Sequence, residues 1–184
     1  MQLRDNGLRF SPFTIALHWI VAALLLSIIV LAVVSSMTTD RMQLSTLIRT
    51  RNLLSLVLFV ISIYRFWQRV SSWHPLPVGT PNPVEVIISR TVAAALALAM
   101  VLLPFAAWLS TATAGQATEL LGGVTIPAVF SPNPSVHAVI NVLFNVGTTA
   151  FLAGLALHIF GALKNHLVLK NDALKRMLGK RVEL

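Results

Sequence analysis

Four long stretches of apolar residues, separated by shorter polar connections, dominate the pattern along the chain. They cover about residues 12–34, 47–67, 90–110 and 136–163. Each is close to the length of about 20 mostly apolar residues that an α-helix needs to cross a bilayer. The pattern therefore predicts an all-α fold, an integral membrane four-helix bundle.

The connections between these stretches are too short for a further domain. Residues 71–83 are rich in proline, which favours a stiff linker over a helix. Residues 111–134 contain several glycines and prolines and a single charged residue, Glu119. We expect this loop to lie on the outer membrane surface as a short amphipathic turn. One transmembrane domain over residues 1–184 is therefore predicted.

Composition narrows the class of protein further. Apolar residues make up 56% of the chain and charged residues only 11%, whereas an ordinary soluble domain is about 25% charged. A water-soluble enzyme is therefore excluded. The chain has no cysteine, which also excludes disulfides, iron–sulfur clusters and thiolate metal sites.

The distribution of charge predicts the orientation. The net charge is +8, from 14 basic and 6 acidic residues. With four spans, both chain ends and the 71–83 linker lie on one side, and most basic residues flank the spans there. The 111–134 loop has no basic residue. The positive-inside rule then places both termini in the cytoplasm. Anionic lipid headgroups account for the charge, so no nucleic-acid partner is predicted.

Two histidines lie inside the apolar stretches. His18 falls in the cytoplasmic third of the first stretch, and His158 falls in the cytoplasmic third of the fourth. Ligating residues within a membrane are costly and mark candidate functional sites. Two imidazoles at matching depth on two helices are the arrangement that axial ligation of a haem iron requires. The alternative is a structural pair bonded to backbone carbonyls or to each other; zinc is less favoured because no carboxylate lies at that depth.

Small and aromatic residues near His158 suit a porphyrin. Gly154 precedes it by about one helical turn, and Gly161 follows it on the same face. These glycines would let a flat macrocycle approach the backbone, with Phe151 as a wall of the pocket. Candidate propionate partners are Arg65 and Arg90, since guanidinium groups pair well with carboxylates. The alternative for both arginines is anchoring at the cytoplasmic headgroups.

The other histidines have weaker cases. His74 lies in the proline-rich linker and His166 lies among lysines, so we expect surface positions for both. His137 begins the fourth stretch, where it either caps or anchors the helix or acts as a ligand.

Further motifs follow one another in a specific order along the chain. They are Arg9-Phe10-Ser11-Pro12-Phe13-Thr14, His18-Trp19, Tyr64-Arg65-Phe66-Trp67, Leu103-Pro104, His158 with Ala162-Leu163-Lys164-Asn165-His166, Lys170-Asn171-Asp172 and Leu174-Lys175-Arg176-Met177. In this order they resemble the bacterial cytochrome b561 family over nearly the whole chain. The resemblance implies a multi-pass protein of the bacterial inner membrane that binds two b haems and exchanges electrons with quinone.

One departure from the family pattern changes the expected cofactor content. The resemblance assigns the first ligand pair to His18 and His158, which are present. Its second pair falls on Arg51 and Phe144, which cannot replace histidine as haem ligands. We therefore expect one haem b, or two if other ligands complete the second site.

Two functions from different classes follow. The leading one is one-electron transfer between quinol or quinone, ubiquinone included, and a redox partner protein. The alternative is a membrane anchor or assembly subunit of a larger respiratory complex, with or without haem. The sequence leaves open whether the chain forms a homodimer. Arg51 either binds a quinone carbonyl or an anion, with Asn52 and Asn141 as polar neighbours, or extends to the outer headgroups as Arg49 is expected to do.

Overall fold

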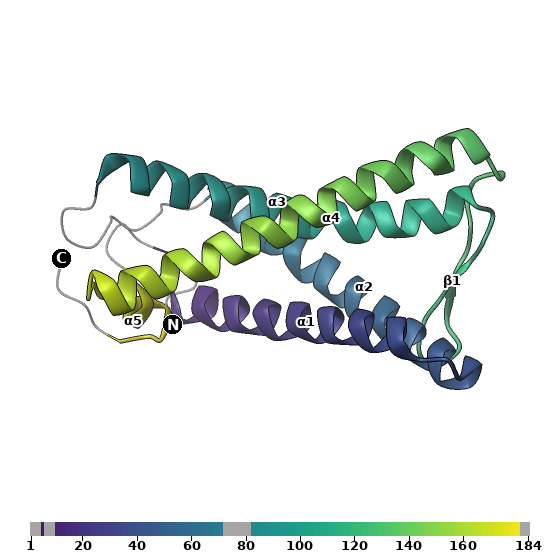
Figure 1. Ribbon diagram of the computed structural model, residues 1–184, viewed down its shortest axis with the longest axis horizontal. Coiled ribbons are helices and arrows are strands. Elements are labelled where there is room, and N and C mark those ends of the chain that lie inside the picture. Colours follow the sequence, from purple (N-terminus) through teal and green to yellow (C-terminus); the bar gives the residue numbers. More distant parts are fainter. Residues whose placement is uncertain (1–4, 6–9, 72–81, 181–184) are drawn as a thin grey trace. The chain divides into compact units, whose positions relative to one another are not determined.

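The computed structural model describes residue 5, residues 10–71 and residues 82–180, and four long helices account for most of them (Figure 1). They are α1 (Pro12–Met37), α2 (Arg41–Ser71), α3 (Pro83–Thr113) and α4 (Pro134–Leu163). Each is long and apolar enough to cross a membrane. The prediction of an all-α fold with four membrane-spanning helices is therefore confirmed.

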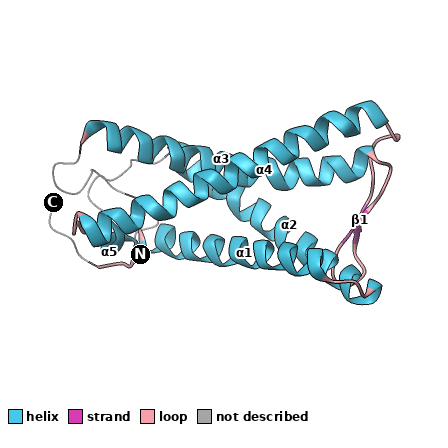
Figure 2. Ribbon diagram, in the orientation of Figure 1, coloured by secondary structure: helices cyan, strands magenta, loops and turns pink. Residues whose placement is uncertain are grey.

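Short elements complete the described chain. A π-helical turn, η1 (Lys164–Val168), continues directly from α4, and a last short helix, α5 (Ala173–Met177), follows it. Figure 2 shows an antiparallel hairpin between α3 and α4, formed by β1 (Thr118–Glu119) and β2 (Thr125–Ile126). This hairpin replaces the amphipathic turn expected between the third and fourth stretches.

The long helices begin where a polar side chain caps them. Ser11 Oγ accepts a hydrogen bond from the Thr14 backbone N–H at 3.1 Å. Asp40, Asn82 and Asn133 accept equivalent bonds at the starts of α2, α3 and α4. Proline occupies the first position of α1, α3 and α4, where its missing N–H has no helical partner to lose and its fixed φ suits the helix.

The helices extend beyond the apolar stretches that predicted them. α2 begins at Arg41 and α3 at Pro83, each several residues before the expected span. The additional first turns of α2 are mostly polar, so hydropathy does not detect them. Those of α3 contain Glu85 and Ser89 among apolar residues. The capping residues mark both starts.

The chain forms two compact units, each containing segments of all four long helices. The first unit comprises Met1–Trp19, Tyr64–Ala99 and Thr149–Leu184. In it, buried Gln68 donates a hydrogen bond to Thr14 Oγ1 at 3.0 Å, which joins α2 to α1. Lys164 joins η1 to α3 through an ion pair with Glu85 at 2.8 Å.

The second unit comprises Ile20–Ile63 and Met100–Thr148. Its buried side chains include Val21, Leu58 and Leu120. Gly147 allows close packing of α4 on α3, since a Cβ there would lie 3.2 Å from Leu103. The hairpin belongs to this unit, and its Leu120 N–H donates to the Val124 carbonyl at 2.8 Å.

Candidate functional site

The first unit brings His18 of α1 and His158 of α4 close together, with their rings tilted relative to one another. Their ring centroids lie 6.3 Å apart with an interplanar angle of 57°. Both side chains are partly buried. The two histidines selected by their depth in the apolar stretches therefore form one site.

The distance between the two rings suits a metal ion held between them. With metal–nitrogen bonds of about 2 Å, two imidazoles on opposite sides of one ion have ring centres about 6 Å apart. Within residues 5, 10–71 and 82–180, no group of three or more His, Asp or Glu side chains could hold a metal ion. An ion at this pair would take its further ligands from groups other than these side chains, and a porphyrin is one source of such ligands.

Three residues near His158 on α4, Phe151, Gly154 and Gly161, differ in how closely other side chains pack against them. Phe151 is buried, with 7% of its surface exposed. A Cβ at Gly154 would meet Leu96 of α3 at 3.5 Å, whereas a Cβ at Gly161 would meet nothing within 4 Å. Gly154 thus faces a packed side chain of α3, and Gly161 borders open space.

Cationic side chains of α2 reach the histidine site. Arg65 Nη1 donates to the carbonyl oxygen of Leu17, the residue before His18, at 3.5 Å. Arg69 Nη2 donates to the carbonyl oxygen of Arg90 at 3.3 Å. The side chain of Arg90 itself is exposed. The sequence singled out Arg65 and Arg90, and the structure adds Arg69.

Trp19 connects this site to the C-terminal segment. Its ring lies edge-on to His18, with centroids 5.5 Å apart. Its indole N–H donates to the carbonyl oxygen of Met177 in α5 at 2.8 Å. The adjacent Arg176 is buried, and this burial lowers the pKa of its guanidinium group. The link between Trp19 and Met177 was not predicted, because no local pattern relates residues so far apart in sequence.

His137 occupies a different position, in the second unit. Its Nδ1 lies 2.9 Å from the Ser110 carbonyl oxygen and its Nε2 lies 2.8 Å from Asn141 Nδ2. Because a carbonyl can only accept, Nδ1 carries the proton and Nε2 accepts from the amide. Both ring nitrogens are thus engaged: Nδ1 joins α4 to α3, and Nε2 bonds within α4. His166 lies in η1, and His74 lies outside the described residues.

Comparison with protein families decides the classification. The family model of prokaryotic cytochrome b561 matches residues 9–180. The chain belongs to this family. A search of curated proteins gives no match. The resemblance inferred from the motifs is confirmed, and the cytochrome is a multi-pass membrane protein of b-type haem electron transfer.

Proposed function

We propose that this cytochrome carries one haem b between His18 and His158 and transfers single electrons through it. The observation that carries the proposal is the 6.3 Å separation of the two imidazole rings, which suits axial ligation from both sides. If both imidazoles held the iron, no position would stay open to dioxygen, which would favour electron transfer over oxygen chemistry.

The residues around the histidines have distinct roles in this proposal. The haem supplies a reversible one-electron couple when it is bound. Arg65, bonded beside His18, is the nearer cation for a propionate, and exposed Arg90 is the second candidate. Phe151 and Gly154 shape the pocket on α4. Burial and the arginine charges together set the reduction potential.

Electron partners and location follow from the family and the charge pattern. We infer that quinol or quinone, with ubiquinone as one candidate, exchanges electrons with a redox partner protein through this site. The excess of basic residues supports placing both termini and the haem near the cytoplasmic face of the bacterial inner membrane. The whole chain, residues 1–184, acts as one membrane domain in this proposal.

A single haem is expected because the second ligand pair has no counterpart. Arg51 and Phe144 stand at the two positions that the family pattern assigns to it. His137 lies in the same unit, but hydrogen bonds engage both of its ring nitrogens. These observations support one haem site per chain.

The test is the ratio of haem to protein in the purified full-length chain, with reduced-minus-oxidised spectra. We expect one haem per chain in the wild type and in His166→Ala, a control histidine in η1. Haem should be lost in His158→Ala, because one axial ligand is missing.

Three results would contradict the proposal. A haem-free wild type would favour the anchor or assembly subunit, whose mark is co-purification with a partner and no reaction with quinol. Two haems per chain would mean that other residues complete a second site. Unchanged haem in His158→Ala would remove the assigned ligation.

A further inference from the structure

A polar pocket of about 600 Å³ lies in the second unit. Its walls come from the N-terminal part of α2, the end of α3 and strand β1. Arg49, Arg51 and Asn52 line it from α2, and Thr118 and Glu119 line it from β1. None of these residues belongs to the histidine site.

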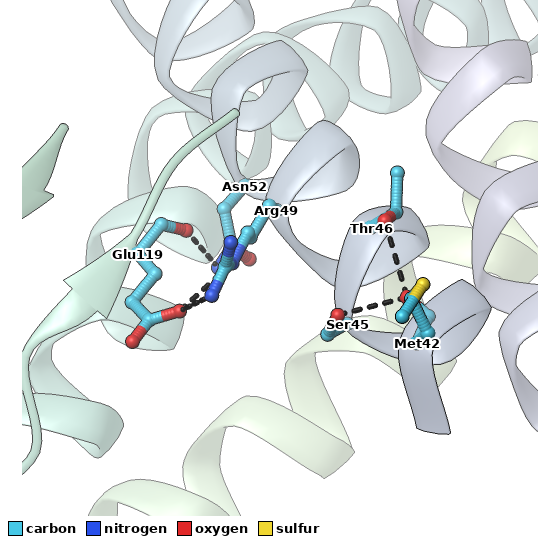
Figure 3. A network of polar contacts seen from close by, with 6 residues as sticks. All are labelled: Met42, Ser45, Thr46, Arg49, Asn52 and Glu119. Atoms are coloured by element: carbon cyan, nitrogen blue, oxygen red, sulfur yellow. Dashed lines mark hydrogen bonds and ion pairs between the residues drawn. The ribbon is translucent and has the colours of Figure 1, made fainter. Parts of the chain in front are cut away.

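One wall of the pocket is held together by polar contacts. Arg49 forms an ion pair with Glu119 at 2.7 Å, and Asn52 Nδ2 donates to the Glu119 carbonyl oxygen at 3.0 Å (Figure 3). The Leu121 N–H adds a bond to the Arg49 carbonyl oxygen at 3.3 Å. Arg49 is therefore paired with the hairpin. Glu119 neutralises its charge.

Two groups of the same pocket lack partners. Arg51 is half-buried and forms no hydrogen bond or ion pair within the part of the chain that the structure describes. Thr118 Oγ1 is buried and has no hydrogen-bond partner among those residues. Burying a hydroxyl without a partner is costly, and so is holding a charge away from water. Since Glu119 offsets Arg49, the pocket keeps one uncompensated positive charge.

We propose that this pocket binds a phosphate-type oxyanion between Arg51 and Thr118. The guanidinium of Arg51 offers charge and paired donors, which suit phosphate geometry. The Thr118 hydroxyl donates a further bond. A neutral ligand would leave the Arg51 charge uncompensated, and a cation would face two arginines against one carboxylate.

The size of the pocket fits more than a bare ion. Sites for small molecules typically measure about 300–1,000 Å³, and the apolar residues Ile48 and Ala117 line the walls beside the polar groups. A phosphate ester with an apolar part therefore suits it. That ester is either the headgroup of a phospholipid or a soluble phosphate compound, and both present the same oxyanion to Arg51.

The experiment measures binding of two probes to the purified full-length protein in neutral detergent. Native mass spectrometry follows retention of phosphatidylglycerol against diacylglycerol, which has no phosphate, and calorimetry follows inorganic pyrophosphate. Removing a charge-assisted bond should weaken binding at least about tenfold in Arg51→Ala. Arg41→Ala, an exposed arginine of the same helix, is the matched control and should bind as the wild type.

Each outcome decides the proposal. If Arg51→Ala loses phosphatidylglycerol and the wild type does not bind pyrophosphate, the ligand is a lipid headgroup. If the wild type binds pyrophosphate and Arg51→Ala does not, the ligand is a soluble phosphate. Equal binding by wild type and Arg51→Ala overturns the site, as does an equal loss in Arg41→Ala. If Arg51→Ala does not fold, Thr118→Val is used, with an expected loss of about threefold; unchanged binding there overturns the proposal.

Discussion

The side chain of Trp19 contacts two neighbours, His18 and Met177. Its ring lies edge-on to His18 while its N–H bonds the Met177 carbonyl. An aromatic ring in this place limits the orientations open to the imidazole, and its polar edge holds α5 against α1. Trp19 thus couples His18 to α5.

Replacing Trp19 with phenylalanine keeps an aromatic ring but removes the N–H donor. We expect Trp19→Phe to lower the free energy of unfolding by about 1 kcal/mol, the usual net value of one hydrogen bond. The measurement is unfolding in detergent. Trp67→Phe is the control, because Trp67 is 60% exposed and donates no hydrogen bond within the described residues. Equal losses in both variants would count against a specific role for the Met177 bond.

The candidate site was only partly predictable at this scale. His18 and His158 stood out because polar residues are rare in apolar stretches, and their depths could be compared. Arg65 could be selected by its place at the end of a span. The Trp19–Met177 bond spans 158 residues and the Arg49–Glu119 pair spans 70. Such contacts depend on tertiary packing, which leaves no local sequence signal.

At the scale of elements, the apolar stretches predicted all four long helices. Their starts were less accurate. The first turns of α2 are mostly polar, and Glu85 and Ser89 interrupt the apolar residues at the start of α3. The hairpin between α3 and α4 was missed, since its strands are two residues long and show no alternation of polar and apolar positions. Its positive-φ glycines, Gly122 and Gly123, are consistent with the tight turn.

Two glycines of this loop provide a matched test of its packing. Gly115 and Gly122 both have positive φ, at 76° and 88°, so alanine strains the backbone similarly at each. A Cβ at Gly115 would lie 2.6 Å from Pro132 Cγ, whereas one at Gly122 would meet nothing within 4 Å. Gly115→Ala should therefore destabilise the protein by about 1–3 kcal/mol more than Gly122→Ala.

This difference is measured by comparing the unfolding free energies of the two variants in the same detergent. Similar losses would show that Pro132 moves aside without cost, and that the contact does not hold the loop in place.

At the scale of the whole molecule, the number of haems sets how electrons can move. Two haems in series can conduct across a bilayer core about 30 Å thick. The single haem proposed for this cytochrome lies nearer to one face of the membrane, so it exchanges electrons more readily with partners on that side. Exchange with quinol or with a partner on the cytoplasmic side is then favoured over transfer across the membrane.

A redox titration of the full-length protein tests this directly. One proposed haem predicts a single one-electron transition, with a slope of about 59 mV per tenfold change in the ratio of oxidised to reduced form. His18→Ala should abolish the transition together with the haem. Two resolved transitions in the wild type would show that a second centre exists.

The distance along the chain between Trp19 and Met177 also concerns how the protein is made. Chains are synthesised from the N-terminus at about 5–20 residues per second, so α1 leaves the ribosome well before α5 exists. The contact that spans 158 residues can form only after Met177 has been synthesised. With the proposed ligation, the haem site is likewise incomplete until His158, in the last long helix, has been synthesised. Haem loading is then a late step of biogenesis, and a nascent chain stalled before α4 has only half of its cofactor site.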